Sequence, residues 1–110
     1  MEEYTVAELI GMVRNFCEER DWNQSHNPKD LAIGISTEAN ELLDIFRFKD
    51  QKDMELIMQE GPQRVHVGEE LADVLFFTLR FAQMYHLDLK EILEDKIEKN
   101  ARKYPVEKAK

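Results

Sequence analysis

Apolar residues recur at steps of three and four in four separate stretches of this chain, and this spacing predicts four amphipathic helices. The first predicted helix begins at a capping box that starts with Thr5 and ends near Arg20. The second begins at Asn27-Pro28, where an N-cap residue precedes proline at the first helical position, and ends near Phe48. Both starts are therefore defined by local chemistry as well as by periodicity.

The second half of the chain predicts two more long helices, which follow a connector. The connector spans residues 49–64 and is charged, with enough apolar residues for one short helix before Gly61-Pro62 stops it. The third long helix is expected over residues 63–85, and the fourth begins at an Asp88 cap and ends before Pro105. The small numbers of glycine (4) and proline (3) favour helices throughout.

The third predicted helix is apolar on nearly every side from residue 74 to residue 79. A helix of that kind must be enclosed by more than one neighbour, and a chain of 110 residues has few neighbours to offer. We therefore expect an all-α fold, an antiparallel four-helix bundle with a short connector helix, that is completed by oligomerisation of identical chains.

Composition limits the organisation of the protein and its partners. The length and the 43% hydrophobic content fit one domain, expected over residues 1–105, followed by a flexible charged tail at residues 106–110. A formal net charge of -8 argues against a nucleic acid polymer as partner. The chain has no signal-like start and no apolar run of about 20 residues, so we expect a cytoplasmic protein without membrane association. Cys17 is expected to be a buried, unreactive thiol, and His66 and His86 surface or helix-end histidines.

Two acidic pairs, Glu38 with Glu41 and Glu70 with Asp73, interrupt the two most apolar stretches. Residues three apart share one face of a helix, so each pair places two carboxylates on one side of a segment that is otherwise suited to burial. Two such helices packed together would gather four carboxylates in one pocket, where a cation is needed to neutralise them. Oxygen ligands favour a hard ion, so the pattern predicts a Mg²⁺ site that could also accept Mn²⁺.

Other interpretations fit parts of this pattern. A single acid pair is most often a solvated helix face. A carboxylate-bridged di-iron protein would need Glu-x-x-His on two helices, but Glu38 and Glu70 are followed three residues on by Glu41 and Asp73. A non-enzymatic helical regulator that binds a basic partner accounts for the charge and the helices, but not for acids that twice interrupt apolar stripes.

Further polar residues could bind a nucleotide, although each also has a simpler explanation. On the fourth helix, Lys96, Asn100 and Lys103 share a face and suit phosphate oxygens, but they equally form a basic last turn that complements the helix dipole. In the loop before the second helix, Trp22 and His26 could stack on a nucleobase and hydrogen-bond to it. Packing of Trp22 onto the end of the bundle explains that residue equally well.

Four motifs taken together resemble one known family. They are Arg-Asp-Trp through His-x-Pro-Lys-x-Leu at residues 20–31, Glu-x-x-Glu-Leu at residues 38–42, Glu-Glu-Leu-Ala-Asp-Val-Leu at residues 69–75, and Lys-x-x-x-Asn-x-x-Lys-Tyr-Pro at residues 96–105. In this order they resemble the MazG-like all-α nucleoside triphosphate pyrophosphohydrolases, especially the small branch that includes dCTP pyrophosphatase. The likeness extends from about Thr5 to Pro105.

The resemblance implies hydrolysis of a nucleoside triphosphate, dCTP-like or modified, to the monophosphate and pyrophosphate, by dimers or tetramers of a helical bundle. It implies that Mg²⁺ is bound by Glu38, Glu41, Glu70 and Asp73. It also implies that the phosphates are bound by Lys96, Asn100, Lys103 and Tyr104, and that the base is bound by Trp22, His26 and Phe48. Phe48 stands where dCTP-preferring relatives tend to have tryptophan, and phenylalanine lacks the indole N–H. The preferred base is therefore left open.

The expected mechanism is attack of water on the α-phosphorus. Mg²⁺ would neutralise charge and lower the pKa of the water, while Lys96 and Lys103 would offset the charge on the departing pyrophosphate. The expected catalytic carboxylates are Glu41, as general base, and Glu38 beside it. Glu41 is favoured as the base because another acid, Asp44, follows it three residues on.

Overall fold

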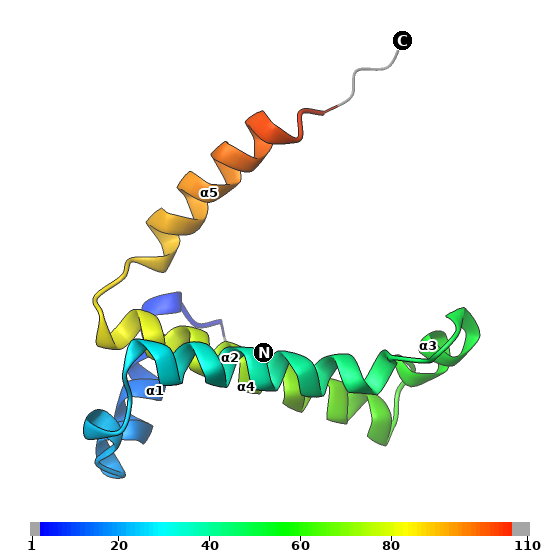
Figure 1. Cartoon of the computed structure of the whole chain (residues 1–110), viewed down its shortest axis with the longest axis horizontal. Helices are drawn as coiled ribbons and strands as arrows, with labels where there is room; N and C mark the ends of the chain where they lie inside the picture. Colours follow the sequence, from blue (N-terminus) through cyan, green and yellow to red (C-terminus); the bar gives the residue numbers. More distant parts are fainter. Residues whose placement is uncertain (1–2, 107–110) are drawn as a thin grey trace.

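Helices make up the ordered elements of this protein in a computed structural model that describes residues 3–106 (Figure 1). The elements are α1 (Val6–Glu19), the single turn η1 (Trp22–Gln24), α2 (Pro28–Phe46), α3 (Gln51–Ile57), α4 (Pro62–Met84) and α5 (Leu89–Lys103). No strand occurs within the described range. The all-α fold, with four long helices and a short connector helix, is confirmed.

The helix starts lie at the caps that the sequence predicts. The Thr5 hydroxyl accepts a hydrogen bond from the Glu8 amide at 3.1 Å, and the Asn27 side chain accepts one from the Asp30 amide at 2.8 Å. These contacts satisfy amide groups that have no partner within the first turn. The end of α2 differs from the prediction, because the helix stops at Phe46 and Phe48 adopts a left-handed backbone with φ of 65°.

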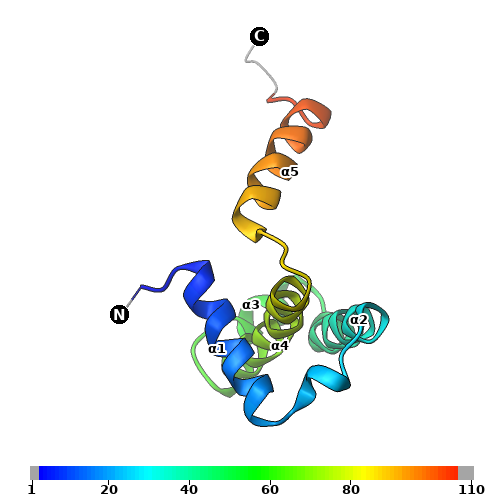
Figure 2. The same cartoon turned by 90° about the vertical axis from the view of Figure 1, so that its left-hand side faces the viewer.

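Three of the long helices pack together. α2 and α4 run antiparallel along much of their length (Figure 1). α1 packs against α4 (Figure 2). The central cluster consists of Val13, Cys17 and Leu79, with Trp22 and Phe76 packed against it. Cys17 is completely buried, as expected, and burial raises the pKa of its thiol.

Gly34 allows α2 to approach α4 closely. A Cβ atom at this position would lie 2.7 Å from two atoms of the Phe77 ring. The ring is itself fixed by an edge-to-face contact with Phe76, whose centroid is 5.5 Å away. The missing side chain therefore helps to set the spacing of the two helices that carry the acidic pairs.

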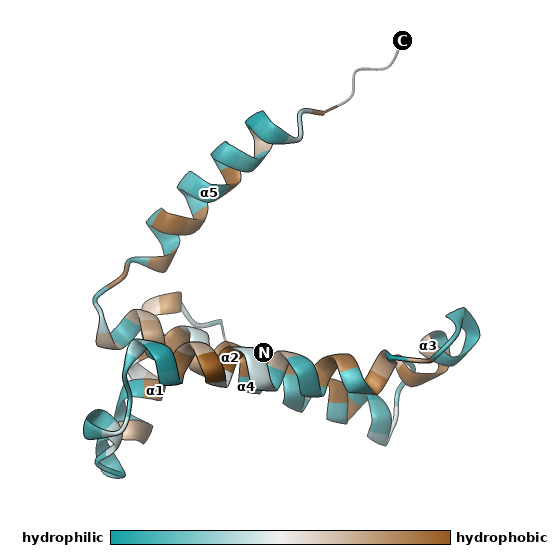
Figure 3. Ribbon diagram, in the orientation of Figure 1, coloured by the Kyte–Doolittle hydropathy of each residue, from teal (hydrophilic) through white to brown (hydrophobic). Residues whose placement is uncertain are grey.

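α5 extends away from the other helices instead of packing along them (Figure 1). The radius of gyration is 17.3 Å, against about 13 Å for a compact domain of this length. Hydrophobic residues recur between hydrophilic ones along the α5 ribbon in Figure 3. Ile92, Leu93 and Ile97 are 46%, 60% and 57% exposed. The predicted stripe is thus present, but a single chain packs only three long helices and leaves the fourth uncovered.

The predicted tail lies outside the described residues except for Val106, which is exposed. Among the helices of residues 3–106, none is both long and apolar enough to cross a membrane.

Candidate functional site

Three of the four predicted metal ligands meet between α2 and α4. Glu38, Glu41 and Glu70 each offer a carboxylate oxygen, and these oxygens lie within 4.8 Å of one another. The antiparallel helix pair brings the middle of α2 to the first half of α4 (Figure 1), and spacing by three residues places both acids of α2 on the same face. Two segments far apart in the sequence therefore form one acidic cluster.

The fourth predicted ligand, Asp73, lies beside this group. It is exposed and does not belong to the set of oxygens within 4.8 Å. Its negative charge nevertheless contributes to raising the pKa of both Glu38 and Glu70. Asp73 is thus near enough to act electrostatically on the cluster, one helical turn after Glu70.

Mutual repulsion and burial perturb the acids of this cluster. A hydrogen bond with Glu41, then burial, then the charges of Glu41, Asp73 and Glu70 raise the pKa of Glu38 to about 7. Burial, followed by the charge of Glu41, raises the pKa of Glu70. Like charges that are held together in a partly dry site favour protonation unless a cation is present.

Two buried oxygens in the cluster have no hydrogen-bond donor within residues 3–106. They are Oε2 of Glu38 and Oε2 of Glu70. A buried carboxylate oxygen without a donor is costly, and a divalent cation satisfies it by coordination. The donor set consists of carboxylate oxygens, which suits a hard ion. The cluster therefore fits the metal-binding role that its sequence predicts.

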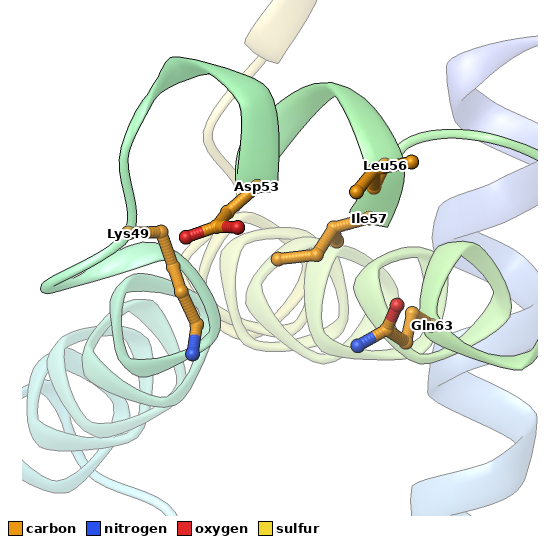
Figure 4. A pocket seen from close by; sticks show the side chains of 5 residues that line it. All are labelled: Lys49, Asp53, Leu56, Ile57 and Gln63. Carbon is orange, nitrogen blue, oxygen red and sulfur yellow. The ribbon is translucent and has the colours of Figure 1, made fainter.

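An open groove leads away from the cluster. It is about 470 Å³ in volume where Glu41, His66 and Glu70 line it, and a neighbouring hollow shares His66 and continues to Lys49 and Gln63. Figure 4 shows the far end of this path, where the Lys49 and Gln63 side chains lie on either side of Ile57. The groove gives solvent, and a ligand of moderate size, access to the acids.

His66, which we expected at the surface or at a helix end, lies close to the acids. Its Nε2 atom is 3.8 Å from Oε1 of Glu70, and its Nδ1 atom is 3.9 Å from Oε1 of Glu69. The signal was present in the sequence, because His66 precedes Glu70 by four residues and such pairs are neighbours on a helix. His66 remains a surface residue, as predicted, but it lines the approach to the cluster.

The predicted phosphate-binding residues lie elsewhere in the single chain. Lys96, Asn100, Lys103 and Tyr104 are exposed on and just after α5, which points away from the cluster (Figure 1). The ammonium group of Lys103 lies 5.3 Å from the centre of the Tyr104 ring. One chain therefore does not bring these residues to the acids.

The predicted base-binding residues form two groups at opposite ends of α2. The rings of Trp22 and His26 are 5.8 Å apart just before the helix starts. Phe48 follows the other end, is 92% exposed and has the Arg47 guanidinium 4.8 Å from its ring centre. The helix between them has 19 residues, a rise of about 28 Å. Phe48 and His26 of one chain therefore cannot contact the same base.

Arg80 is not among the residues that the sequence predicts for the site. It is completely buried on α4 and donates a hydrogen bond from Nε to Nδ1 of His26 at 2.9 Å. A lone arginine directly after the apolar run of α4 was the available signal, because a charged side chain in such a position requires hydrogen-bond partners. The sequence alone does not identify those partners.

Comparison with known proteins agrees with the four motifs. A family model described as MazG-like matches residues 33–110. The chain is 31% identical to dCTP pyrophosphatase 1 of Rattus norvegicus over 104 residues and 34% identical to that of Mus musculus over 106 residues. Each match covers 94% of this chain and 61% of the relative, so the chain spans less than two thirds of these relatives.

A solved structure gives a match over nearly its whole length. The crystal structure of a pyrophosphatase from Archaeoglobus fulgidus superposes with a TM-score of 0.82 at 37% identity, covering 96% of this chain and 97% of that one. At this identity the likeness extends to sequence as well as fold. Taken with the family model and the four motifs, these matches show that the chain belongs to the MazG-like family.

Proposed function

We propose that this protein is a Mg²⁺-dependent nucleoside triphosphate pyrophosphohydrolase, which converts an NTP or dNTP to the monophosphate and pyrophosphate. The observation that carries the proposal is the acidic cluster, in which two buried carboxylate oxygens have no donor within the described part of the chain. The open groove beside it supports access by a triphosphate. Relatives named dCTP pyrophosphatase 1 and a structural neighbour named a pyrophosphatase support the same activity.

Glu38, Glu41, Glu70 and Asp73 are the residues that would hold the metal, and Mn²⁺ would suit the same oxygens. Mg²⁺, when bound, supplies neutralisation of charge and a lower pKa for water in the site. Without it, four acids would repel the anionic triphosphate. The cluster therefore has a role in substrate binding as well as in chemistry.

Glu41 is the proposed general base. Its side chain is exposed and lines the groove, where it can accept a proton from the water that attacks the α-phosphorus. Glu38 is half-buried and lies beside Glu41 in the same cluster, where it would help to hold the metal next to that carboxylate. Pyrophosphate then leaves with the electron pair of the broken P–O bond.

The complete site requires a second copy of the chain. Lys96, Asn100, Lys103 and Tyr104 on α5 lie away from the acids of their own chain. We propose that α5 of a second copy supplies these residues to the phosphates in a homodimer or homotetramer. Two uncovered apolar surfaces support this: the stripe on α5, and a groove of about 440 Å³ on α4 that Leu71 and Leu75 line.

The same assembly would complete the base site. Trp22 and His26 lie together at one end of α2, and Phe48 of a second copy would join them. Aromatic side chains on two sides of a base supply stacking. The names of the relatives favour dCTP or a modified cytosine nucleotide as substrate.

The test is an assay of purified protein with Mg²⁺ against a panel of normal and modified triphosphates, with product identification. We expect the monophosphate and pyrophosphate in equal amounts, with no release of single phosphates, and loss of turnover in chelator. Absence of pyrophosphate with every triphosphate would reject the enzyme and favour a helical regulatory protein. Iron that remains bound through purification, with visible absorption, would favour a di-iron protein instead.

A further inference from the structure

Arg80 is the only charged residue that is fully buried among residues 3–106. Its guanidinium forms no ion pair within this range. It donates instead to three uncharged acceptors: Nδ1 of His26 at 2.9 Å, Oδ1 of Asn23 at 2.7 Å and Oε1 of Gln83 at 2.5 Å. A buried cation without an anion is rare, and it persists only where several hydrogen bonds compensate it.

Two of these three acceptors come from the loop between α1 and α2, more than 50 positions away in the sequence. Arg80 therefore joins the loop that carries Trp22 and His26 to the C-terminal part of α4. The guanidinium is planar and its donors point in fixed directions. A lysine at this position could not reach His26 and Asn23 with the same geometry.

The contact also determines which nitrogen of His26 carries hydrogen. The Nε atom of Arg80 is a donor only, so Nδ1 of His26 must present its lone pair. In a neutral imidazole the hydrogen then resides on Nε2. Burial, and next the charge of Arg80, lower the pKa of His26, while the charge of Asp30 acts in the opposite direction. The ring is therefore neutral near pH 7.

The other nitrogen of His26, Nε2, is available for another partner. Within residues 3–106 no hydrogen bond involves Nε2 of His26, and the ring is only half-buried. The Trp22 ring lies 5.8 Å away at a tilt of 54° and is itself held edge-on to Phe16 at 5.5 Å. An indole packed against Phe16 and an imidazole of fixed tautomer thus stand side by side.

We propose that Arg80 is a positioning residue that holds His26 as an Nε2–H donor to the nucleobase. Such a donor would select a base that presents a ring nitrogen or a carbonyl oxygen on the edge facing His26, as cytosine does with N3 and O2. The proposal rests on the proposed function, because it takes the Trp22–His26 loop as the base site. It adds a residue that touches neither the base nor the phosphates.

The first experiment observes the imidazole directly. Full-length protein labelled with ¹⁵N would be studied by long-range ¹H–¹⁵N NMR, with Arg80→Lys as the test variant and the exposed Arg14→Lys as its matched control. We expect one neutral Nε2–H form for His26 in the wild type and in Arg14→Lys, and a mixture of tautomers in Arg80→Lys. An Nδ1–H form in the wild type, or an unchanged pattern in Arg80→Lys, would overturn the proposal.

If Arg80→Lys does not fold, two variants that retain Arg80 replace it. His26→Gln keeps an N–H donor, whereas His26→Leu removes it. With these proteins, dCMP is titrated as the probe and deoxyribose 5-phosphate serves as the probe without a base. We expect dCMP to shift the Nε2–H signal of wild-type His26 and the sugar phosphate to leave it unchanged. Equal shifts with both probes, or tighter dCMP binding by His26→Leu than by His26→Gln, would count against a donor to the base.

Kinetics separate the positioning role from a structural one. In Arg80→Lys we expect KM for the best triphosphate to rise about tenfold, the loss of one well-placed hydrogen bond, with kcat nearly unchanged. Inhibition by inorganic tripolyphosphate, which has no base, should be the same as in the wild type. Weaker tripolyphosphate binding would instead indicate that the phosphate site is disturbed. If no triphosphate is hydrolysed, the proposed function fails, yet the tautomer and the dCMP titration still decide the role of Arg80.

Discussion

Glu38 on α2 and Glu70 on α4 each bury one oxygen, Oε2, that no donor reaches within residues 3–106, and both belong to one acidic cluster. From this relationship we expect Glu38→Gln or Glu70→Gln to lower turnover with Mg²⁺ by about 100-fold or more, since each removes a proposed metal ligand. In chelator the same variants should melt at a higher temperature than the wild type, because repulsion within the cluster is relieved.

The matched control is Glu69→Gln, one position along α4, where the carboxylate is exposed and outside the cluster. It should keep near wild-type turnover and melting temperature. The measurements are steady-state assays and thermal melts with and without Mg²⁺. A Glu70→Gln protein with wild-type turnover would remove that residue from the site.

A second prediction concerns pH. Hydrogen bonding with Glu41, burial and neighbouring charges raise the pKa of Glu38 from 4.5 to about 7. The folded protein therefore binds this proton more tightly than the unfolded chain. The contribution of Glu38 to stability is complete below about pH 4.5 and is lost as the pH rises through about 7. Because the ligands must be deprotonated, stabilisation by Mg²⁺ should increase over the same interval.

Thermal melts in chelator and in Mg²⁺, from about pH 5 to pH 8, would measure this effect. Comparison with Glu38→Gln isolates it, because every other titrating group is shared by the two proteins. We expect the wild type to lose stability relative to the variant as the pH rises in chelator. Parallel curves would mean that Glu38 titrates normally.

A third prediction tests the contact between α2 and α4. Gly34→Ala would place a Cβ atom 2.7 Å from the Phe77 ring, which forces an overpacked core at a cost of about 1–3 kcal/mol. The gain in helix propensity offsets about 1 kcal/mol of this. We expect a net loss of about 1 kcal/mol in the free energy of unfolding.

The control is Gly11→Ala in α1, where nothing lies within 4 Å of the added atom. That variant should gain about 0.5–1 kcal/mol from propensity alone. Denaturant unfolding of the two variants and the wild type measures both values. A stabilised Gly34→Ala protein would show that the helices can separate without loss.

A fourth prediction tests whether two chains share one site. Lys96→Ala and Glu70→Gln should each be nearly inactive. When the two variants are refolded together in equal amounts as a dimer, about a quarter of the sites would combine intact halves. We expect activity to recover toward that fraction, with Lys90→Ala, at the other end of α5, as a fully active control. Mixtures that stay inactive would argue that each chain builds its own site.

The features that depend on neighbouring residues were predictable from the sequence. Capping by Thr5 and Asn27 fixes the starts of α1 and α2 through contacts three residues away. The acidic pairs were predictable for the same reason, because a helix brings Glu38 and Glu41 to one face. The pairing of α2 with α4 was predictable because the connector of residues 49–64 is long enough for an antiparallel return.

Features that depend on distant residues were not predictable. The apolar stripe of α5 indicates that the helix needs a partner surface, but periodicity does not state whose surface it is. The bond from Arg80 to His26 joins positions 54 apart, and no local pattern encodes it. His66 was the intermediate case, because its contact with Glu70 spans a single helical turn.

Because α5 projects away from the other helices of its chain, the concentration of the protein is expected to affect its activity. This 15-residue helix is near the length at which isolated helices are only marginally stable in water, so its order would depend on what covers it. If that cover is another copy, mass action governs whether the phosphate-binding residues of α5 meet the acids. Specific activity would then decline on dilution while the acids stay correctly assembled, and a protein assayed at too low a concentration would appear to be a poor enzyme.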